Sequence, residues 1–553
     1  MQTDIRLTLP ALFTEAVRKY GNRDALAYVG KTPLTYSETN RNIRALMAYM
    51  ERLGVEPGDK VAILSSNMPN WGIAYLAIAS MGAVVVPLLP DFHPNEVRNI
   101  LNHSESKTLL VSQGLRSKAP SMEESFLKHI LNIEDFSNLS NEENASSFDE
   151  TAEPEGSYQV EEHEPASIIY TSGTTGKSKG VMLSHRNIAF TAQQVLNIQH
   201  VGPQDRMLSI LPLSHTYENT LGFILPLFNG ACVYYLNKPP TPAILVPAMK
   251  KVRPTLMLSV PMVIEKIYRN KILPSLTGKK HMRMLYSLPP IRKKLNKIAG
   301  KKLYETFGSR LKFFGIGGAK LDPKVEKFLQ EAGFPYAIGY GLTETSPLLA
   351  GTNAQNTRLQ STGPAMKGVE LKIHNPDPSS GEGEIWARGD NVMMGYYKDP
   401  EKTREVLTED GWFKTGDLGV FDQDNFLFIK GRLKNMIVGE NGENIYPEEI
   451  ESEINNFRHV VESLVVREKG KLVAMVHFNR EEIFQKYHEL KEEVHQYAEE
   501  RIDELSKELR EYINSRVNRF SRIQHVFVQN EPFEKTATQK IKRYLYNKLS
   551  NRQ

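Results

Sequence analysis

The chain has 553 residues, enough for more than one domain, and its 40% hydrophobic and 24% charged residues are typical of a globular protein. A net charge of +4 is small at this length, so nothing requires a nucleic-acid partner. The single cysteine, Cys232, excludes an intramolecular disulfide framework and a cysteine-based zinc site.

Neither a signal peptide nor a membrane span is expected. Residues 1–10 lack the basic-then-apolar pattern of a signal peptide. The longest apolar stretch, residues 74–89, is interrupted by Gly82 and Pro87 and is too short to cross a bilayer. We therefore expect a cytoplasmic protein.

The N-terminal part predicts a parallel sheet covered by helices. An amphipathic helix at 11–21 and a hairpin at 24–36 come first. A buried strand at 60–64, a helix over about 71–81 and a strand at 83–88 follow, and then a helix at 93–104 and a strand at 107–111. Strand, helix and strand at this spacing indicate βαβ units.

A polar segment at about 113–165 is expected to be a surface loop, and it leads to the stretch YTSGTTGKSKGVMLSH at 170–185. A short apolar strand ends here, and glycines, hydroxyls and lysines follow it. Glycines let backbone N–H groups face an anion, while hydroxyls and ammonium groups add donors and charge. The loop is therefore predicted to hold phosphates. It is not a Walker A motif, because Thr171 stands where that motif requires its first glycine. The alternative is a flexible surface turn.

Two further segments carry candidate functional residues. Residues 207–236 read as strand, loop, buried helix and strand, with His215 and Tyr217 in the loop, where α/β proteins place ligands. A core histidine is the alternative for His215. Helices are expected within 261–312, and the run from 279 to 302 carries nine Lys and Arg among apolar residues, with no acidic residue between them. The nine are Lys279, Lys280, Arg283, Arg292, Lys293, Lys294, Lys297, Lys301 and Lys302. They form either a solvated basic face or a surface that lies on an anionic membrane.

The predicted secondary structure of the remaining chain changes at two points. FFGIGGAK at 313–320 is a strand and a glycine turn, but Lys320 replaces the third glycine of a dinucleotide fingerprint. GYGLTETSP at 339–347 also follows an apolar run, and residues 362–431 read as short strands of a β-rich subdomain. After residue 431 the composition becomes that of a small α+β domain. We predict two domains, 1–431 and 432–553.

Five ordered motifs together are highly specific: the glycine-rich loop, GYGLTETSP, GWFKTGDLG at 411–419, GRLKNMIV at 431–438 and KTATQKIKR at 535–543. With them the chain resembles the adenylate-forming enzymes over essentially its whole length, and is most similar to the long-chain fatty-acid–CoA ligases. The resemblance implies a large N-terminal domain of parallel-sheet α/β units with a β-rich subdomain, and a small mobile C-terminal α+β domain. It also implies activation of a fatty acid by ATP to acyl-AMP with release of pyrophosphate, then transfer to coenzyme A. Transfer to an acyl carrier protein and a non-catalytic lipid-binding role are the alternatives.

The resemblance also implies roles for individual residues. Lys540, Glu344 and Thr343 would be catalytic, with Thr343 touching the α-phosphate, and Lys434 would be the hinge. Glu344 and Thr171 would bind Mg²⁺, and His215 and Tyr217 would border the acyl pocket. Tyr340 would stack on adenine, while Asp417 and Arg432 would hold the ribose. The residues implied to bind ATP are Thr171, Ser172, Gly173, Thr174, Thr175, Gly176, Lys179, Gly317, Gly318, Ala319, Gly339, Tyr340, Gly341, Asp417 and Arg432. Gln539 departs from the glycine that usually precedes the lysine in the terminal motif.

The chemistry of this reaction agrees with such a site. A carboxylate that attacks the α-phosphate brings anion to anion, so charge must be neutralised before the reacting atoms can align. The carboxylate is already ionised at pH 7, so no general base is required. The expected ligands are ATP, Mg²⁺, fatty acid and coenzyme A, with no nucleic acid. A homodimer and peripheral contact with a membrane remain open at this point.

Overall fold

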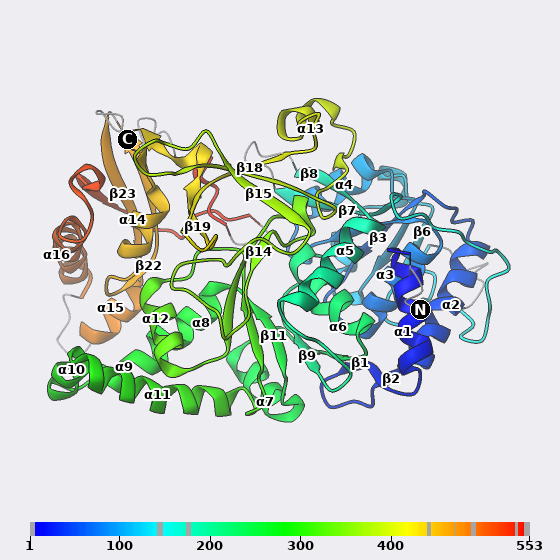
Figure 1. Cartoon of the computed structure of the whole chain (residues 1–553), viewed down its shortest axis with the longest axis horizontal. Helices are drawn as coiled ribbons and strands as arrows, with labels where there is room; N and C mark the ends of the chain where they lie inside the picture. The colour runs from blue at the N-terminus through cyan, green and yellow to red at the C-terminus, as the bar shows by residue number, and fades with distance from the viewer. Residues whose placement is uncertain are drawn as a thin grey trace.

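The computed structural model describes residues 6–140, 148–172, 178–438, 444–468, 470–487, 494–536 and 540–546. Two large, mostly parallel sheets, a smaller antiparallel sheet and a C-terminal sheet with its own helices make up the molecule (Figure 1). The predicted fold class is therefore confirmed.

The first large sheet has its strands in the order β14-β13-β12-β11-β9-β10-β1-β2. Its inner neighbours are parallel, and only the two outermost pairs are antiparallel. The strands are β1 (Asp24–Tyr28), β2 (Leu34–Thr35), β9 (Arg206–Ser209), β10 (Cys232–Tyr235), β11 (Leu256–Ser259), β12 (Phe313–Ile316), β13 (Tyr336–Tyr340) and β14 (Ala350–Gly351). The carboxyl ends of parallel strands meet at one edge, which is where such sheets bind ligands.

The second large sheet has the order β17-β8-β7-β4-β3-β5-β6. Its strands are β3 (Lys60–Leu64), β4 (Val84–Leu88), β5 (Thr108–Val111), β6 (His129–Asn132), β7 (Pro165–Ser172), β8 (Ser178–Ser184) and β17 (Gly395–Tyr396). The loop between β7 and β8 is shorter than predicted. The two strands form an antiparallel hairpin whose paired residues extend to Ser172 and Ser178. Lys179 therefore lies on a strand opposite Thr171.

Sixteen α-helices are found within the described residues. They are α1 (Leu9–Tyr20), α2 (Tyr36–Arg52), α3 (Pro69–Ser80), α4 (Pro94–Ser104), α5 (His185–Gln194), α6 (Leu225–Phe228), α7 (Pro242–Val252), α8 (Pro261–Ile267), α9 (Leu273–Thr277), α10 (Lys280–Ser287), α11 (Pro289–Thr306), α12 (Pro323–Ala332), α13 (Pro400–Val406), α14 (Pro447–Ile454), α15 (Arg480–Tyr487) and α16 (Val494–Asn514). None of them, over the part of the chain that the structure describes, is both long enough and apolar enough to cross a membrane.

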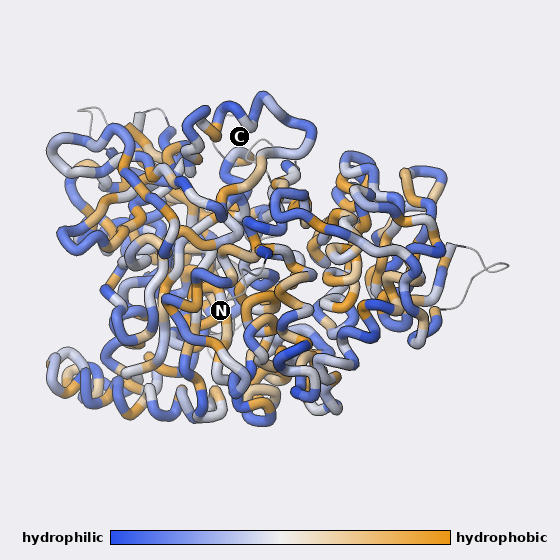
Figure 2. Tube along the Cα trace, turned by 45° about the vertical axis from the view of Figure 1, so that its right-hand side comes forward, coloured by the Kyte–Doolittle hydropathy of each residue, from blue (hydrophilic) through white to orange (hydrophobic). Residues whose placement is uncertain are grey.

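Helix α3 explains the apolar stretch seen in the sequence. It contacts β3 and β4 of the second sheet as well as β1 of the first, and nearly all of its residues are buried. A helix buried on every side is apolar all round rather than amphipathic. Figure 2 shows hydrophobic segments gathered inside the molecule and hydrophilic ones on its outer turns.

The β-rich subdomain is a four-stranded antiparallel sheet with the order β15-β16-β18-β19. Its strands are β15 (Val369–His374), β16 (Gly383–Gly389), β18 (Phe413–Phe421) and β19 (Leu427–Arg432). Buried and partly buried residues alternate along β16, as expected for a sheet with one face on the core.

The C-terminal part begins after β19, where the short turn η7 (Leu433–Asn435) contains Lys434. Its strands are β20 (Ile437–Val438), β21 (Asn444–Ile445), β22 (Val460–Glu468), β23 (Lys471–Phe478) and β24 (His525–Val528). Its buried apolar residues form clusters that include none from the large sheets. This part therefore has a core of its own, as a domain requires.

Candidate active site

Three side chains from different elements meet at the end of β13. Asp417 on β18 lies opposite Arg432 on β19, and the two form an ion pair of 2.8 Å between Oδ1 and Nε. The Tyr340 hydroxyl donates a hydrogen bond of 2.8 Å to the other oxygen, Oδ2, of Asp417. Burial raises the pKa of Asp417, while Arg432 and the Tyr340 hydrogen bond oppose the increase. The structure thus brings together the predicted adenine and ribose residues.

A second group surrounds Glu344, which lies in the short turn η6 (Thr343–Thr345) with the buried Thr343. The Tyr396 hydroxyl on β17 donates a hydrogen bond of 2.9 Å to Glu344 Oε1. The Lys179 ammonium lies 4.7 Å from the centre of the Tyr396 ring. Burial lowers the pKa of Lys179, and the Glu344 carboxylate opposes this decrease. Tyr396 was not singled out from the sequence, although two consecutive tyrosines after Gly395 could have marked it as a candidate site residue.

Lys540, from the C-terminal part, lies within electrostatic range of both groups. Thr536 and Lys540 are linked by hydrogen bonds of 2.8 and 3.2 Å, which fix the backbone around the lysine. The Lys540 side chain is accessible to solvent. Desolvation by the surrounding protein nevertheless lowers its pKa, Arg432 lowers it further, and Asp417 and Glu344 oppose the decrease. The carboxylates of Asp417 and Glu344 therefore both stabilise the charged form of the Lys540 ammonium group.

Several predicted residues cannot be placed in this geometry. Gly173, Thr174, Thr175 and Gly176 lie outside the described residues, as does Gln539. Their predicted phosphate and loop roles stay predictions. Thr171 and Ser172 lie at the end of β7 and Lys179 near the start of β8, so they flank the loop on both sides.

Glycines allow close approach of backbone segments around the site. Gly341 lies so near the next segment that an added Cβ would fall 1.8 Å from the Pro347 carbonyl oxygen, so no other residue fits there. Gly318 has a φ of +87°, which favours glycine, and Gly318 and Ala319 are exposed just after β12. Gly317 lies against the Tyr217 ring, where an added Cβ would be 3.1 Å from it.

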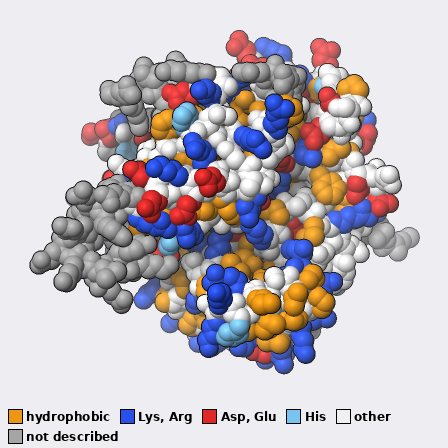
Figure 3. All heavy atoms as spheres, turned by 90° about the vertical axis from the view of Figure 1, so that its left-hand side faces the viewer, with side chains coloured by type: hydrophobic (Ala, Val, Ile, Leu, Met, Phe, Trp, Pro, Cys, Tyr) orange, Lys and Arg blue, Asp and Glu red, His pale blue; other side chains and the backbone are white. Residues whose placement is uncertain are grey.

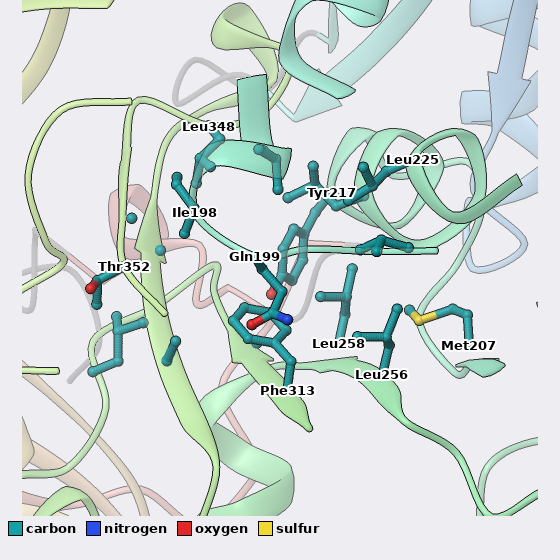
Figure 4. A pocket seen from close by; sticks show the side chains of 18 residues that line it. Ile198, Gln199, Met207, Tyr217, Leu225, Leu256, Leu258, Phe313, Leu348 and Thr352 are labelled. Carbon is teal, nitrogen blue, oxygen red and sulfur yellow. The ribbon is translucent and has the colours of Figure 1, made fainter. Parts of the chain in front are cut away.

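An apolar pocket lies between the segment that follows α5 (residues 195–201), the π-helix η4 (Tyr217–Ile224) and strands β11, β12 and β13 (Figure 4). Figure 4 shows the side chains of Tyr217, Leu258 and Phe313 converging within it. The pocket is lined by Val195, Ile198, Gln199, Val201, Met207, Tyr217, Leu221, Leu225, Leu256, Leu258, Phe313, Gly315, Ala337, Ile338, Gly339, Leu348, Gly351 and Thr352. Its wall is almost entirely hydrophobic, so it suits an alkyl chain.

The two residues predicted for the acyl pocket lie differently. Tyr217 lines the pocket, whereas His215 is not among the lining residues and lies in the preceding turn. Burial lowers the pKa of His215 to about 4, and the Lys540 ammonium contributes to the decrease. His215 is therefore a neutral ring at pH 7 and does not belong to the pocket wall.

A buried acid next to Tyr217 was not predicted. Glu218 is completely buried at the start of η4. Burial raises its pKa to about 8, with the Ser209 hydroxyl and the Ile210 backbone N–H opposing the increase. The start of η4 therefore carries a protonated, uncharged carboxyl group at neutral pH.

The geometry also fits a magnesium ion at Glu344. Across the described residues no three His, Cys, Asp or Glu side chains converge on one point. Mg²⁺ in phosphate-binding sites commonly takes one or two carboxylates and completes its shell with phosphate oxygens and water. A single carboxylate fixed by Tyr396, with the Lys179 ammonium over the same tyrosine ring, is consistent with that donor set.

Comparison with known proteins identifies the family. A model of the AMP-binding enzyme family matches residues 13–397. The match covers more than half of the chain, and the chain belongs to the AMP-binding enzyme family. The expected resemblance to adenylate-forming enzymes, and among them to long-chain fatty-acid–CoA ligases, is confirmed.

Two curated relatives show the range of this similarity. The long-chain-fatty-acid–CoA ligase heimdall of Drosophila melanogaster is 31% identical over 496 residues, which cover 80% of this chain and 72% of the relative. The chloroplastic long-chain-fatty-acid–acyl-carrier-protein ligase AEE15 of Arabidopsis thaliana is 28% identical, with 86% of this chain and 76% of the relative covered.

Solved structures agree on the fold. ATP-bound MatB from Rhodopseudomonas palustris superposes with a TM-score of 0.76 at 23% identity and covers 99% of both chains. The o-succinylbenzoate coenzyme A synthetase MenE of Bacillus subtilis, in complex with ATP and magnesium ion, gives 0.75 at 22% identity, covering 96% of this chain and 98% of its own. At such identities the likeness shows the fold alone.

Proposed function

We propose that this protein is an ATP-dependent ligase that converts a long-chain fatty acid to acyl-AMP, releases pyrophosphate, and transfers the acyl group to coenzyme A. The observation that carries the proposal is that the apolar pocket and the charged groups adjoin each other. Gly339 and Tyr217 line the apolar pocket, while Tyr340 beside Gly339 bonds to Asp417, which pairs with Arg432. A hydrophobic tail in the pocket would therefore bring its carboxylate to the charged groups.

In the first half-reaction the residues of this chain bind, orient and neutralise. Asp417 and Arg432 hold the ribose hydroxyls, which fixes the α-phosphate relative to the pocket. The Lys540 ammonium and the Thr343 hydroxyl would stabilise the charge that develops as the carboxylate oxygen bonds to the α-phosphorus and pyrophosphate leaves. Glu344 and Thr171 would hold Mg²⁺, which supplies charge neutralisation at the phosphates.

The second half-reaction needs a different arrangement of the same residues. The thiolate of coenzyme A attacks the acyl carbonyl carbon, and AMP leaves with the bonding electrons. Lys540 belongs to the C-terminal part, which connects to strand β19 of the β-rich subdomain through Lys434. Rotation about Lys434 would withdraw Lys540 after adenylation and open the acyl-AMP to the thiol.

The length of the fatty acid and the nature of the acceptor are tested in one assay. Purified protein is incubated with ATP, Mg²⁺ and straight-chain acids from short to long, and pyrophosphate is measured before and after addition of coenzyme A or of acyl carrier protein. We expect pyrophosphate release to be highest with long acids and thioester to form with coenzyme A.

Other outcomes would change the proposal in defined ways. If thioester formed only on the acyl carrier protein, the proposed activity would become the one named for AEE15. Highest activity with short acids would contradict the long-chain assignment. Absence of pyrophosphate release with every acid would remove the ligase function altogether.

A further inference from the structure

An exposed corner made by α10 and the outer face of α11 has no covering element within the described residues. Helix α10 has no buried residue, and its Met284 is 76% exposed. Leu285, Leu288 and Ile298 nearby are 39%, 48% and 53% exposed. Large hydrophobic side chains seldom gather on a free surface unless something binds them there.

The inner face of the corner is firmly held, so its outer face is presented in a fixed orientation. The Arg292 guanidinium on α11 binds Glu331 on α12, with 2.8 Å between Nη2 and Oε1. The buried Asn296 donates a 2.7 Å hydrogen bond to Glu331 and accepts one of 2.9 Å from the Tyr286 hydroxyl on α10. One of the nine basic residues, Arg292, is thus committed to the fold.

The other eight basic residues remain on the outside. Lys293, Lys297 and Lys301 follow at intervals of four, which places them along one side of α11. Ile298 lies exposed among them. All eight are exposed, and none forms an ion pair with a described acidic side chain: Lys279, Lys280, Arg283, Lys293, Lys294, Lys297, Lys301 and Lys302. The corner is therefore both apolar and strongly cationic.

We propose that the corner formed by α10 and α11 docks on the surface of an anionic lipid bilayer, with Met284, Leu285 and Leu288 inserted among the lipids. Figure 3 shows hydrophobic and basic side chains side by side at the lower centre, where this corner faces the viewer. A helix with this combination lies in the interface plane, its cations at the headgroups and its apolar side chains below them. The charge selects an anionic leaflet, and the apolar residues select lipid over a soluble polyanion.

The docking surface goes beyond the proposed ligase activity and does not depend on it. It uses no residue of the active site. A ligase for fatty acids would gain from it, because such acids partition into bilayers and are concentrated where the protein would bind.

The test is co-sedimentation of the full chain with vesicles of phosphatidylcholine and phosphatidylserine, and with vesicles of phosphatidylcholine alone. We expect binding to the anionic vesicles that weakens at high salt, and much less binding to the neutral ones. Replacing Lys293, Lys294 and Lys297 by Glu should reduce the partition coefficient at least about 100-fold, because three near-surface cations are lost.

A matched control makes the same charge change elsewhere. Lys31, Lys128 and Lys367 are also exposed and have no ion-pair partner within the described chain, so replacing them by Glu should leave most of the binding intact. Unchanged thermal unfolding and unchanged pyrophosphate release would show that each variant is folded.

A second variant separates lipid from other anionic partners. Met284→Ser with Leu285→Ser keeps every cation, and vesicle binding should fall while its salt dependence persists. If this variant bound the vesicles as tightly as wild type, charge alone would account for the attraction, as it would for a nucleic acid. That result would overturn the lipid assignment. Absence of binding to anionic vesicles at low salt, or equal loss in the control triple variant, would also overturn it.

Discussion

The buried carboxyl group of Glu218 makes the folded state sensitive to pH in a direction opposite to that of an ordinary surface acid. Its pKa is about 8 in the folded protein, against an ordinary value of 4.5. Between these values the native state holds a proton that the unfolded chain has released. The free energy of unfolding should therefore fall as the pH rises from about 4.5 to about 8.

The perturbation that isolates this effect is Glu218→Gln, which keeps the shape of the side chain and removes its proton equilibrium. At about 1.4 kcal/mol for each pH unit, the interval between the two pKa values corresponds to an upper limit of about 5 kcal/mol. The gain in stability of the variant over wild type should grow across this interval and be largest above pH 8. Glu451, whose pKa burial raises to about 7, has the same sign, so wild type must be compared with the variant at every pH.

Urea unfolding at several pH values, followed by tryptophan fluorescence, measures this difference. The three tryptophans, Trp71, Trp386 and Trp412, all lie outside the C-terminal part, so the signal reports the domain that contains Glu218. Glu305→Gln, at an exposed position, is the control for loss of a surface carboxylate, and its difference from wild type should stay flat. A flat difference for Glu218→Gln as well would refute the argument from burial.

Three further predictions concern the active site. Lys540→Ala should slow acyl-AMP formation by about 100-fold or more, about 3 kcal/mol, yet spare thioester formation from preformed acyl-AMP; equal loss in both half-reactions would rule out the alternating arrangement. Lys434→Pro should leave adenylation near normal and block the thioester step, because proline fixes φ, and single-turnover assays that find both steps intact would place the hinge elsewhere. Tyr396→Phe removes the hydroxyl that holds Glu344 and should raise the Mg²⁺ concentration for half-maximal pyrophosphate release about tenfold; an unchanged Mg²⁺ requirement would show that Glu344 does not need this contact.

Local patterns in the sequence determined the architecture and the class of chemistry. Alternating strand and helix signals from residue 60 onward predicted the parallel units, since period and βαβ spacing are properties of short segments. The order of five motifs predicted the family, and Asp417 and Arg432 were predicted to act on one ligand before their pairing across β18 and β19 was visible. These inferences depend on neighbours in sequence or on motif identity.

Tertiary structure alone decided which distant groups meet and how deeply each is buried. Tyr396 reaches Glu344 from 52 residues away, and the strand that carries it had no predicted partner. In the sequence, Arg292 did not differ from the other eight basic residues. The structure shows that it binds Glu331 on α12. Glu218 read as an ordinary polar residue, and only the packing of η4 against β9 shows that it is sealed from water. Charge and hydropathy belong to a residue, but desolvation and pairing belong to its surroundings, and the chain folds those surroundings from segments that a local pattern does not connect.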